Sequence, residues 1–398
     1  MTEQLDVELS MAEFFLTPTI RALAERRERP GPAGEVADSV PLTSTLRRLW
    51  HRHHAHARPA VYNIAHRVDL RGALDRGHLA GALSDLVGRH HALRGRASHH
   101  DGEYRFEVLA QVPVELPLDD LTGSSDDAVE RWCQEQATRP FAMDRAPVFR
   151  FRLARLGPDH WVLVTVFHHA VCDGWSLGIV WRELRELYDA RQSGSGESPA
   201  PPAVQFTDCA RREHALSGDR RAELEEFWRT ELEGVPLRLP LPYDRPRPER
   251  LSGAGALHTW RVQGPVPGRS AEAAATLRTT PYVVLAATFA TWAGRLCGGL
   301  PDVVLAASSA NRSAAERAGV VGFLGDAVLV RARLGAAGTF ADLVRQLGAT
   351  LFTALDHQEL PLTDVVEVVS GETVENPSSR PCCSRWSPHR RRTFPCAA

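Results

Sequence analysis

The chain alternates between stretches with a helical period of apolar residues and stretches with a strand period, so helices and strands are expected in one fold. Residues 77–93 place their leucines at helical spacing, and residues 102–109 alternate as a strand. The apolar, β-branched run at 160–167 has strand length and is typical of a strand buried within a sheet. Residues 176–190 return to a helical period. A strand, a short loop and a helix are therefore predicted in succession here.

The second half of the chain repeats this mixture. Residues 222–234 and 281–298 are expected to form helices, and residues 302–309 are expected to form a buried strand. Between the two halves, residues 191–203 are rich in Gly, Ser and Pro, which is typical of a flexible loop. A second α/β lobe is the simplest interpretation of this repetition.

The two ends of the chain differ from this pattern. Residues 4–27 contain a capping-box pattern at Ser10 and Glu13 and are expected to form a small helical unit. Residues 28–39 are rich in Pro, Gly and charge without periodicity, and we interpret them as a linker. Residues 378–398 cluster Arg, Pro, Ser and three of the seven cysteines, so an out-of-frame or disordered tail is expected there.

Composition narrows the possible functions. With 398 residues, 43% of them hydrophobic and 24% charged, the chain is long enough for two or three packed units. A formal net charge of -2 gives no field that would attract nucleic acid, and no apolar run approaches the ~20 residues of a membrane helix. We therefore expect no nucleic-acid partner and no membrane partner. A cytoplasmic location is expected. The absence of lysine excludes a Walker A lysine and a pyridoxal Schiff base.

Two histidine-rich stretches raise the question of metal binding. In FHHAVCDGWS, His168, His169, Cys172 and Asp173 are all metal-ligand types. Neighbouring residues on a strand point to opposite faces, however, and no second ligand pair follows, so no metal site is expected. The other stretch, HRHHAHA at 51–57, is expected to continue a helix with a solvated face.

Proton transfer and a structural role are the remaining interpretations of the first stretch. A histidine at a strand end, followed by Asp-Gly, is a good layout for a positioned imidazole. Alternatively, His168 is a packed core residue and Asp173 is a turn residue or a helix N-cap. We favour the structural interpretation for these two residues, which leaves His169 as the catalytic candidate.

The stretch HHAVCDGWS resembles the H-H-x-x-x-D-G motif of the condensation domains of nonribosomal peptide synthetases, a branch of the chloramphenicol-acetyltransferase-like acyltransferases. From residue 40 to about residue 377, further stretches are similar to elements of that family in the same order. They are PLTSTLRRLW, YNIAHRVDLRGALD, GRHHALRGR, QFTDCARRE, ASSANRS, VGFLGDAVLVR and HQELPLTDVV. This colinear set is far more specific than the motif alone.

The resemblance implies an α/β fold, an α+β sandwich, with two chloramphenicol-acetyltransferase-like lobes that form a V around a central tunnel. The second lobe would be incomplete, because the family's last strands have no counterpart here. The N-terminal helical unit resembles the last helices of a carrier domain without its phosphopantetheine serine. The implied organisation is a carrier remnant at 1–27, a linker at 28–39, a first lobe at 40–215, a truncated second lobe at 216–377 and a tail at 378–398.

The resemblance also implies amide bond formation, in which the α-amine of a carrier-bound aminoacyl thioester attacks a carrier-bound acyl or peptidyl thioester. The substrates would arrive on the 4'-phosphopantetheine of partner carrier domains, with no cofactor bound directly and an adenylation domain as a further partner. A thioester is already activated, and a model α-amine has a pKa of about 7.7–8.0. The site therefore needs mainly alignment and a group that accepts or orients the amine proton.

The resemblance assigns the catalytic motif to His168, His169, Asp173 and Gly174. His169 would be the general base or orienting group. Asp173 would be structural and paired with an arginine. Gly174 would shape the loop, and its backbone N–H would face the reacting carbonyl.

Five other residues are candidates for supporting roles. Arg94 and Arg312 are both possible partners of the motif aspartate, and the sequence does not choose between them. Trp175 and Ser176 follow the motif and are candidates for substrate binding. Asp326, which stands where the family usually has asparagine, is a candidate on the acceptor side.

Two other functions compete with condensation. The truncated second lobe and the missing carrier serine are consistent with a catalytically inactive fragment that acts as a docking or gatekeeping piece. Epimerisation domains share the two histidines but typically continue D-G-V-S-W, whereas this chain has DGWS, so epimerisation ranks below both.

Overall fold

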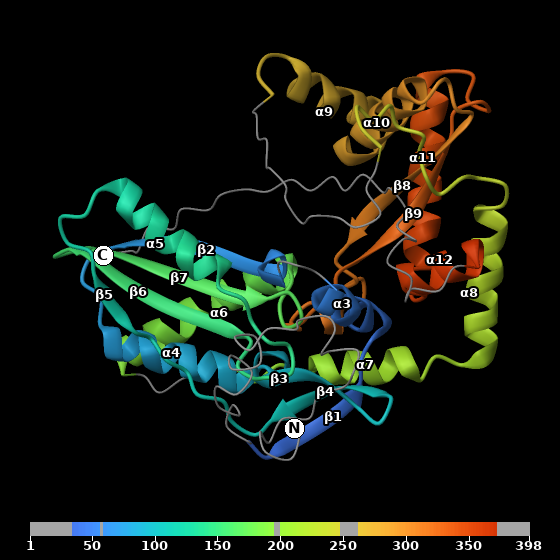
Figure 1. The fold of residues 1–398 in the computed structure, drawn as a ribbon. Helices are drawn as coiled ribbons and strands as arrows, with labels where there is room; N and C mark the ends of the chain where they lie inside the picture. Colours follow the sequence, from blue (N-terminus) through green and yellow to red (C-terminus); the bar gives the residue numbers. More distant parts are fainter. Residues whose placement is uncertain (1–33, 56–58, 195–199, 247–261, 372–398) are drawn as a thin grey trace.

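The chain folds into two lobes of mixed helices and strands, which confirms the α/β class (Figure 1). The first lobe runs to α7 (Phe206–His214), and the second begins at α8 (Gly218–Glu231). No helix in the described part of the chain has both the length and the hydropathy that a membrane span requires. The computed structural model describes residues 34–55, 59–194, 200–246 and 262–371.

The described residues of the first lobe form two sheets. Its strands are β1 (Val36–Pro41), β2 (Asn63–Arg71), β3 (Gly95–His100), β4 (Glu103–Leu109), β5 (Leu118–Asp120), β6 (Phe149–Gly157) and β7 (His160–His168). One sheet has the order β1-β4-β3, and the other has the order β2-β7-β6-β5. All neighbouring strands are antiparallel except β5 and β6, which are parallel.

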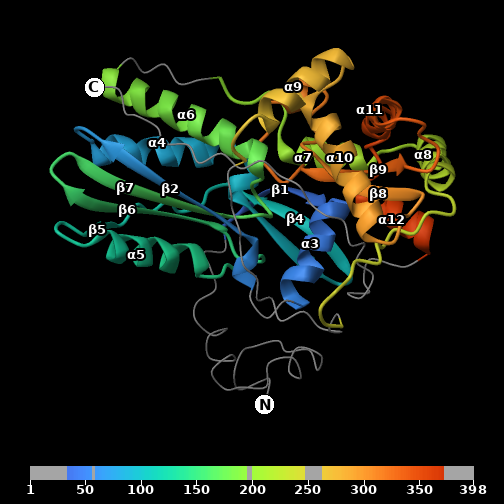
Figure 2. The same cartoon turned by 90° about the horizontal axis from the view of Figure 1, so that it is seen from above.

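Helices cover both faces of the four-stranded sheet. Those of the first lobe besides α7 are α3 (Ser44–Ala55), α4 (Arg76–Arg89), α5 (Asp126–Thr138) and α6 (Gly174–Ser193), with short 3-10 segments η1 (Pro59–Tyr62) and η2 (His91–Arg94). Figure 2 shows α4 and α6 on one side of this sheet and α5 on the other. This arrangement explains why β7, an interior strand of the sheet, carries apolar residues on both of its faces.

The strand predicted at 160–167 is β7, and it is buried on both faces as its apolar run indicated. Val162, Val164 and Val166 pack in the small core beneath α5. Leu163 and Phe167 point the opposite way, into the large core of the first lobe. Because both faces are occupied, β7 has little freedom to shift, and its C-terminal end is a rigid support for the residues that follow.

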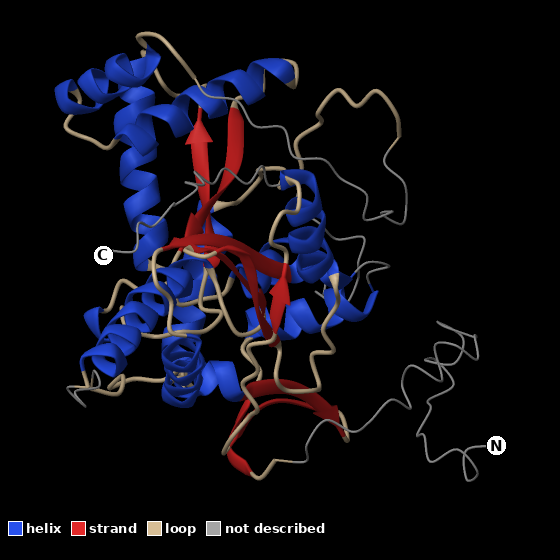
Figure 3. Cartoon of the chain, turned by 90° about the vertical axis from the view of Figure 1, so that its left-hand side faces the viewer, coloured by secondary structure: helices blue, strands red, loops and turns tan. Residues whose placement is uncertain are grey.

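The second lobe is built around a two-stranded antiparallel sheet of β8 (Asp302–Ser309) and β9 (Asp326–Arg333). Its remaining elements within residues 216–246 and 262–371 are α9 (Val266–Thr276), α10 (Pro281–Leu296), the 3-10 turn η3 (Ala315–Arg317), α11 (Phe340–Asp356) and α12 (Leu362–Ser370). Side chains from α8, α10 and α11 form a separate core against this sheet. Figure 3 shows its two strands near the top of the view, above the strands of the first lobe.

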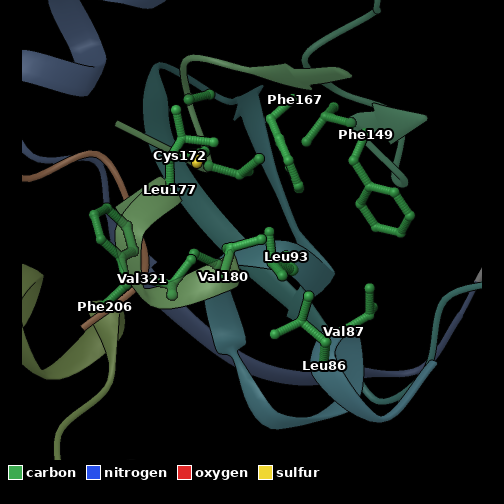
Figure 4. Close-up of a cluster of buried hydrophobic side chains, with 14 of the residues drawn as sticks. Leu86, Val87, Leu93, Phe149, Phe167, Cys172, Leu177, Val180, Phe206 and Val321 are labelled. Carbon is green, nitrogen blue, oxygen red and sulfur yellow. The ribbon is translucent and has the colours of Figure 1, made fainter. Parts of the chain in front are cut away.

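One segment of the second lobe packs into the core of the first. Val320, Val321 and Leu324, which precede β9, are buried with residues of α6 and α7. Figure 4 shows Val321 beside Phe206 in this cluster. A Cβ atom at Gly322 would lie 2.5 Å from the Phe206 ring, and the φ of this glycine is 154°, so a side chain would not fit there.

The structure corrects two boundaries. The predicted linker at 28–39 extends too far, because β1 begins at Val36 and is held by pairing with β4, a partner that the local sequence does not reveal. The predicted loop at 191–203 begins too early, because α6 continues to Ser193 and ends at Gly194 in the left-handed conformation (φ 66°). The carrier remnant predicted at 1–27 and the tail at 378–398 lie outside the described residues.

Candidate active site

The histidine pair lies where β7 leaves its sheet. The N–H of His168, the last residue of the strand, donates to the carbonyl of Val148 (2.9 Å). The N–H of His169 donates to the carbonyl of Tyr62 (2.8 Å). Backbone hydrogen bonds therefore fix both residues, and the loop then passes through four buried residues, 170–173, into α6.

His168 is fully buried and hydrogen-bonded through both ring nitrogens. The N–H of Ala170 donates to Nδ1 of His168 (3.1 Å), and Nε2 of His168 lies 3.1 Å from Nδ1 of His53 on α3. A backbone amide only donates, so Nδ1 of His168 is an acceptor and the proton of the neutral ring is on Nε2. His168 therefore donates to His53.

Burial keeps His168 uncharged. Desolvation lowers the pKa of His168 to about 3, with smaller contributions from His53, His169 and His54. In the unfolded chain a histidine has a pKa of about 6.5. Between these values the unfolded state binds more protons than the native state, so acidification from about pH 6.5 towards 3 lowers the free energy of unfolding.

His169 lies at the boundary between the lobes. The side chain is partly exposed, and its ring centroid is 4.3 Å from that of Phe323, with a tilt of 56°. Phe323 belongs to residues 320–325 of the second lobe, which precede β9. The two motif histidines thus have different partners, and in the described residues no three His, Cys, Asp or Glu side chains converge as a metal site requires.

Asp173 connects the loop after β7 to the second lobe. As the N-cap of α6 it accepts the N–H of Ser176 at Oδ1 (2.8 Å). Its Oδ2 accepts the backbone N–H groups of Leu324 (3.1 Å) and Gly325 (2.9 Å). A residue that caps a helix in one lobe therefore also holds the backbone of the other.

Arg312 completes this connection. Its Nη1 donates to Oδ2 of Asp173 (2.9 Å) and its Nη2 to Oδ1 (3.2 Å), and the two side chains are only 1% and 5% exposed. Nη2 also lies within hydrogen-bond distance of the carbonyls of Val320 (3.1 Å) and Gly322 (3.2 Å). We call Asp173, Arg312 and residues 320–325 the interlobe latch.

The structure chooses between the two arginines that the sequence left open. Arg94 donates from Nη1 to the carbonyls of Leu109 and Ala110, beside the end of β4. Its contacts lie within the first lobe, so the prediction of Arg94 as a partner of Asp173 is wrong. Arg312 is that partner, because the loop after β8 brings it to the start of α6.

Comparison with known protein families identifies the family of this chain. The family model described as "Condensation domain" matches residues 36–377, which is most of the chain. The chain belongs to the condensation domain family. Amide bond formation is the general reaction of condensation domains in nonribosomal peptide synthetases.

Individual relatives agree with this assignment. The domain is 32% identical over 380 residues to the probable non-canonical nonribosomal peptide synthetase CymA of Salinispora arenicola, covering 92% of this chain and 5% of CymA. It is 31% identical over 396 residues to the phosphinothricin tripeptide synthetase PhsB of Streptomyces viridochromogenes, covering 95% and 33%. The chain thus spans a third or less of these relatives.

A solved structure shares the fold. The X-domain in its complex with OxyB from teicoplanin biosynthesis superposes with a TM-score of 0.73 at 26% identity, covering 86% of this chain and 76% of that one. The two-lobed condensation fold implied by the motifs is therefore confirmed. The central tunnel stays a prediction.

The other predicted site residues of this condensation domain differ in how far they are exposed to solvent. Trp175 is 48% exposed and donates from Nε1 to the Ala318 carbonyl of the second lobe (2.9 Å). Gly174 is exposed, and an added Cβ would meet no atom within 4 Å, so the space beside it is open. Ser176 is fully buried, with its hydroxyl 2.7 Å from Oδ1 of Asp173, so direct substrate binding by Ser176 is corrected to a structural role.

Asp326 lies between α3 and α12 at the start of β9, and its role in substrate binding stays a prediction. Its Oδ2 accepts the N–H of Leu362 at the start of α12 (2.9 Å) and the hydroxyl of Thr45 on α3 (3.4 Å). Its Oδ1 lies 3.6 Å from Arg48. Position in the motif identifies the start of β9 but does not reveal that two helices enclose this carboxylate.

Replacing Asp326 with asparagine is expected to stabilise the domain at pH 7 by about 1 kcal/mol, the scale of one buried polar group. Burial raises the pKa of Asp326 above its ordinary value, so its contribution to stability is present at acid pH and is lost as the pH rises. Asparagine keeps an acceptor for Leu362 and removes the buried charge. Urea unfolding at pH 7 and pH 4 checks this, and a gain at pH 4 as large as at pH 7 contradicts it.

The sequence interpretation missed two residues of the site, His53 and Phe323. The solvated face predicted for residues 51–57 is wrong for His53, which is 8% exposed and follows Leu46 and Leu49 on the buried side of α3. The spacing of these three residues, i, i+3 and i+7, is the signal that places His53 on the apolar face. No local pattern identifies Phe323, because its contact with His169 depends on how the lobes meet.

Proposed function

We propose that this condensation domain joins a carrier-bound acyl or peptidyl thioester to the α-amine of a carrier-bound aminoacyl group, with His169 accepting or orienting the amine proton. The amine nitrogen forms a C–N bond with the thioester carbonyl carbon, and the C–S bond breaks. The proton lost by the amine balances the thiolate that leaves, so the products are an amide and a free phosphopantetheine thiol.

The observation that carries this proposal is the contrast between the two motif histidines. His168 is fully buried and its pKa is lowered to about 3, which makes it unsuitable as a base that meets substrate. His169 is partly exposed beside Phe323, at the boundary between the lobes. Its Nδ1 is shielded from solvent, so Nε2 is the nitrogen that we assign to the amine.

The start of α6 provides the second half of the proposed site. Gly174, the first residue of this helix, is exposed and has open space beside it. A helix N-terminus carries partial positive charge, which favours a developing oxyanion. We assign the thioester carbonyl to this space, one short loop away from His169. The latch at Asp173 then fixes the distance between the base and the oxyanion donor.

The substrates and partners follow from this reaction. Both substrates would be carried on 4'-phosphopantetheine arms of separate carrier domains, and this chain would bind no cofactor directly. An adenylation domain of the same or a neighbouring synthetase would load the acceptor. The relatives CymA and PhsB are named as peptide synthetases, which supports partners of this kind.

A reconstituted condensation assay tests the proposed function. One carrier protein is loaded with an aminoacyl donor and a second with an aminoacyl acceptor, from a panel of amino acids. We expect this domain to produce a dipeptidyl thioester on the acceptor carrier, detected by mass spectrometry of the released product. Product formation no faster than without the domain, across the panel, would argue against catalysis.

A docking role is the second candidate. The X-domain with which this chain shares its fold was solved in a complex with OxyB, a partner protein. If this chain is also a docking domain, we propose that its partners are loaded carrier proteins, which it would bind without turning them over. Retention of carriers on the immobilised domain, together with no dipeptidyl product, would favour docking over condensation.

A further inference from the structure

The hydrogen bonds around His168 run in one direction. The Ala170 N–H can only donate, so His168 must accept at Nδ1 and donate from Nε2. The receiving atom is Nδ1 of His53, 3.1 Å away. Nδ1 of His53 must therefore be unprotonated. In this series each donor precedes its acceptor in the order Ala170, His168, His53.

The series holds only while both rings are neutral. A proton on Nδ1 of His53 would face the Nε2–H of His168, and a proton on Nδ1 of His168 would face the Ala170 N–H. The titratable rings around the pair are His54 on α3, Tyr62 on η1 and His169. None of these is an acid that would favour a charged imidazole.

His53 reaches the pair from the buried side of α3. It lies in the last turn of α3 and is 8% exposed, with Leu46 and Leu49 buried on the same side of the helix. The same helix contacts the second lobe through Thr45 and Arg48, both beside Asp326. Because α3 holds the ring of His53 in this way, His168 has a fixed hydrogen-bond acceptor. His169 is the next residue in the chain, so its position depends on that of His168.

We propose that His53 is a positioning residue for the reaction: its Nδ1 accepts the Nε2–H of His168 and holds that ring in place, and through the strand end it fixes His169. His53 touches no reacting atom in this arrangement. The inference rests on the proposed function for its kinetic consequence, whereas its structural part, the hydrogen bond from Nε2 of His168 to His53, stands independently of any activity.

Three substitutions at His53 separate the acceptor from the bulk of the ring. Asparagine places an oxygen at the same number of bonds from Cβ as Nδ1, so His53→Asn keeps the acceptor. His53→Phe keeps a ring without an acceptor, and His53→Gln moves the acceptor one bond farther out. His54→Asn is the matched control, because His54 is exposed and its Nδ1 bonds instead to the Trp50 carbonyl.

We expect His53→Phe and His53→Gln to lower kcat by about tenfold or more, with KM nearly unchanged, since a buried donor loses its acceptor beside the catalytic residue. His53→Asn should stay within about threefold of the parent, as should His54→Asn. If His53→Phe does not fold, the comparison of Asn with Gln decides. Equal kcat values for those two variants would overturn the proposal.

Nitrogen-15 NMR of the histidine rings tests the structural part without an activity assay. At pH 7, His168 should be neutral with its proton on Nε2, both in the parent and in His53→Asn. A protonated His168, or one with its proton on Nδ1, would overturn the inference even if the domain condenses substrates. The expected tautomer with no condensation in any variant would leave the positioning of His168 intact and remove the proposed function.

Discussion

His169→Ala is expected to lower the rate of dipeptide formation by about 100- to 10,000-fold, the usual contribution of a positioned general base or acid. The residue is partly exposed, and its ring contacts Phe323 rather than filling a core. Its backbone N–H remains bonded to Tyr62 in the variant. The loss should therefore appear in kcat, with circular dichroism and the unfolding midpoint close to those of the parent.

The control for this substitution is His160→Ala. His160 is the first residue of the same strand, and it bonds to Asp69 at the end remote from the site. This variant should retain the activity of the parent, because only a surface contact is removed. Undiminished product yield in His169→Ala, measured with the same loaded carriers, would show that a group other than His169 accepts or orients the amine proton.

Arg312→Ala is expected to lower the free energy of unfolding by about 3–5 kcal/mol, because it leaves a buried carboxylate without its partner. Arg312 and Asp173 are 1% and 5% exposed, so the carboxylate depends on the guanidinium and on backbone N–H groups rather than on bulk water. The backbone of residues 320–325 also loses donors to its carbonyls. Activity should fall as well, since Phe323 belongs to this segment. Denaturant unfolding followed by tryptophan fluorescence measures the change.

Two further variants make this result specific. Arg229→Ala removes an exposed arginine on α8 that pairs with Glu225 and Glu226, and it should change stability by about 0.5 kcal/mol or less. The double variant Asp173→Ala with Arg312→Ala should be less destabilised than the sum of the single variants, because no charge is left unpaired. Additive losses would mean that the two side chains contribute independently.

Local patterns predicted the parts of the fold that depend on neighbours in the chain. The apolar run at 160–167 and the helical period at 176–190 correspond to β7 and to part of α6. The loop between them was therefore located correctly, as was the contrast between a packed His168 and a partly exposed His169. These features follow from burial on two faces and from side-chain periodicity.

Contacts between distant segments could not be predicted in this way. Arg94 and Arg312 have the same chemistry, and only the packing of the two lobes brings one of them to Asp173. Ser176 follows the motif in sequence, but the turn of the helix carries it inward, where its hydroxyl meets the backbone of Gly322 in the other lobe. Residues whose partners lie more than a hundred positions away leave no local signal.

The burial of Val320 and Val321 among the side chains of the first lobe has a consequence for synthesis on the ribosome. These residues are translated more than a hundred positions after the end of α7 at His214. Synthesis proceeds at about 5–20 residues per second, so roughly 5–20 s pass between the synthesis of α7 and that of Val320. During this time the apolar side chains beside Phe206 lack their partners from the second lobe. During that interval the nascent first lobe is a target for chaperones and for aggregation, so slower elongation between the lobes should reduce the yield of folded protein.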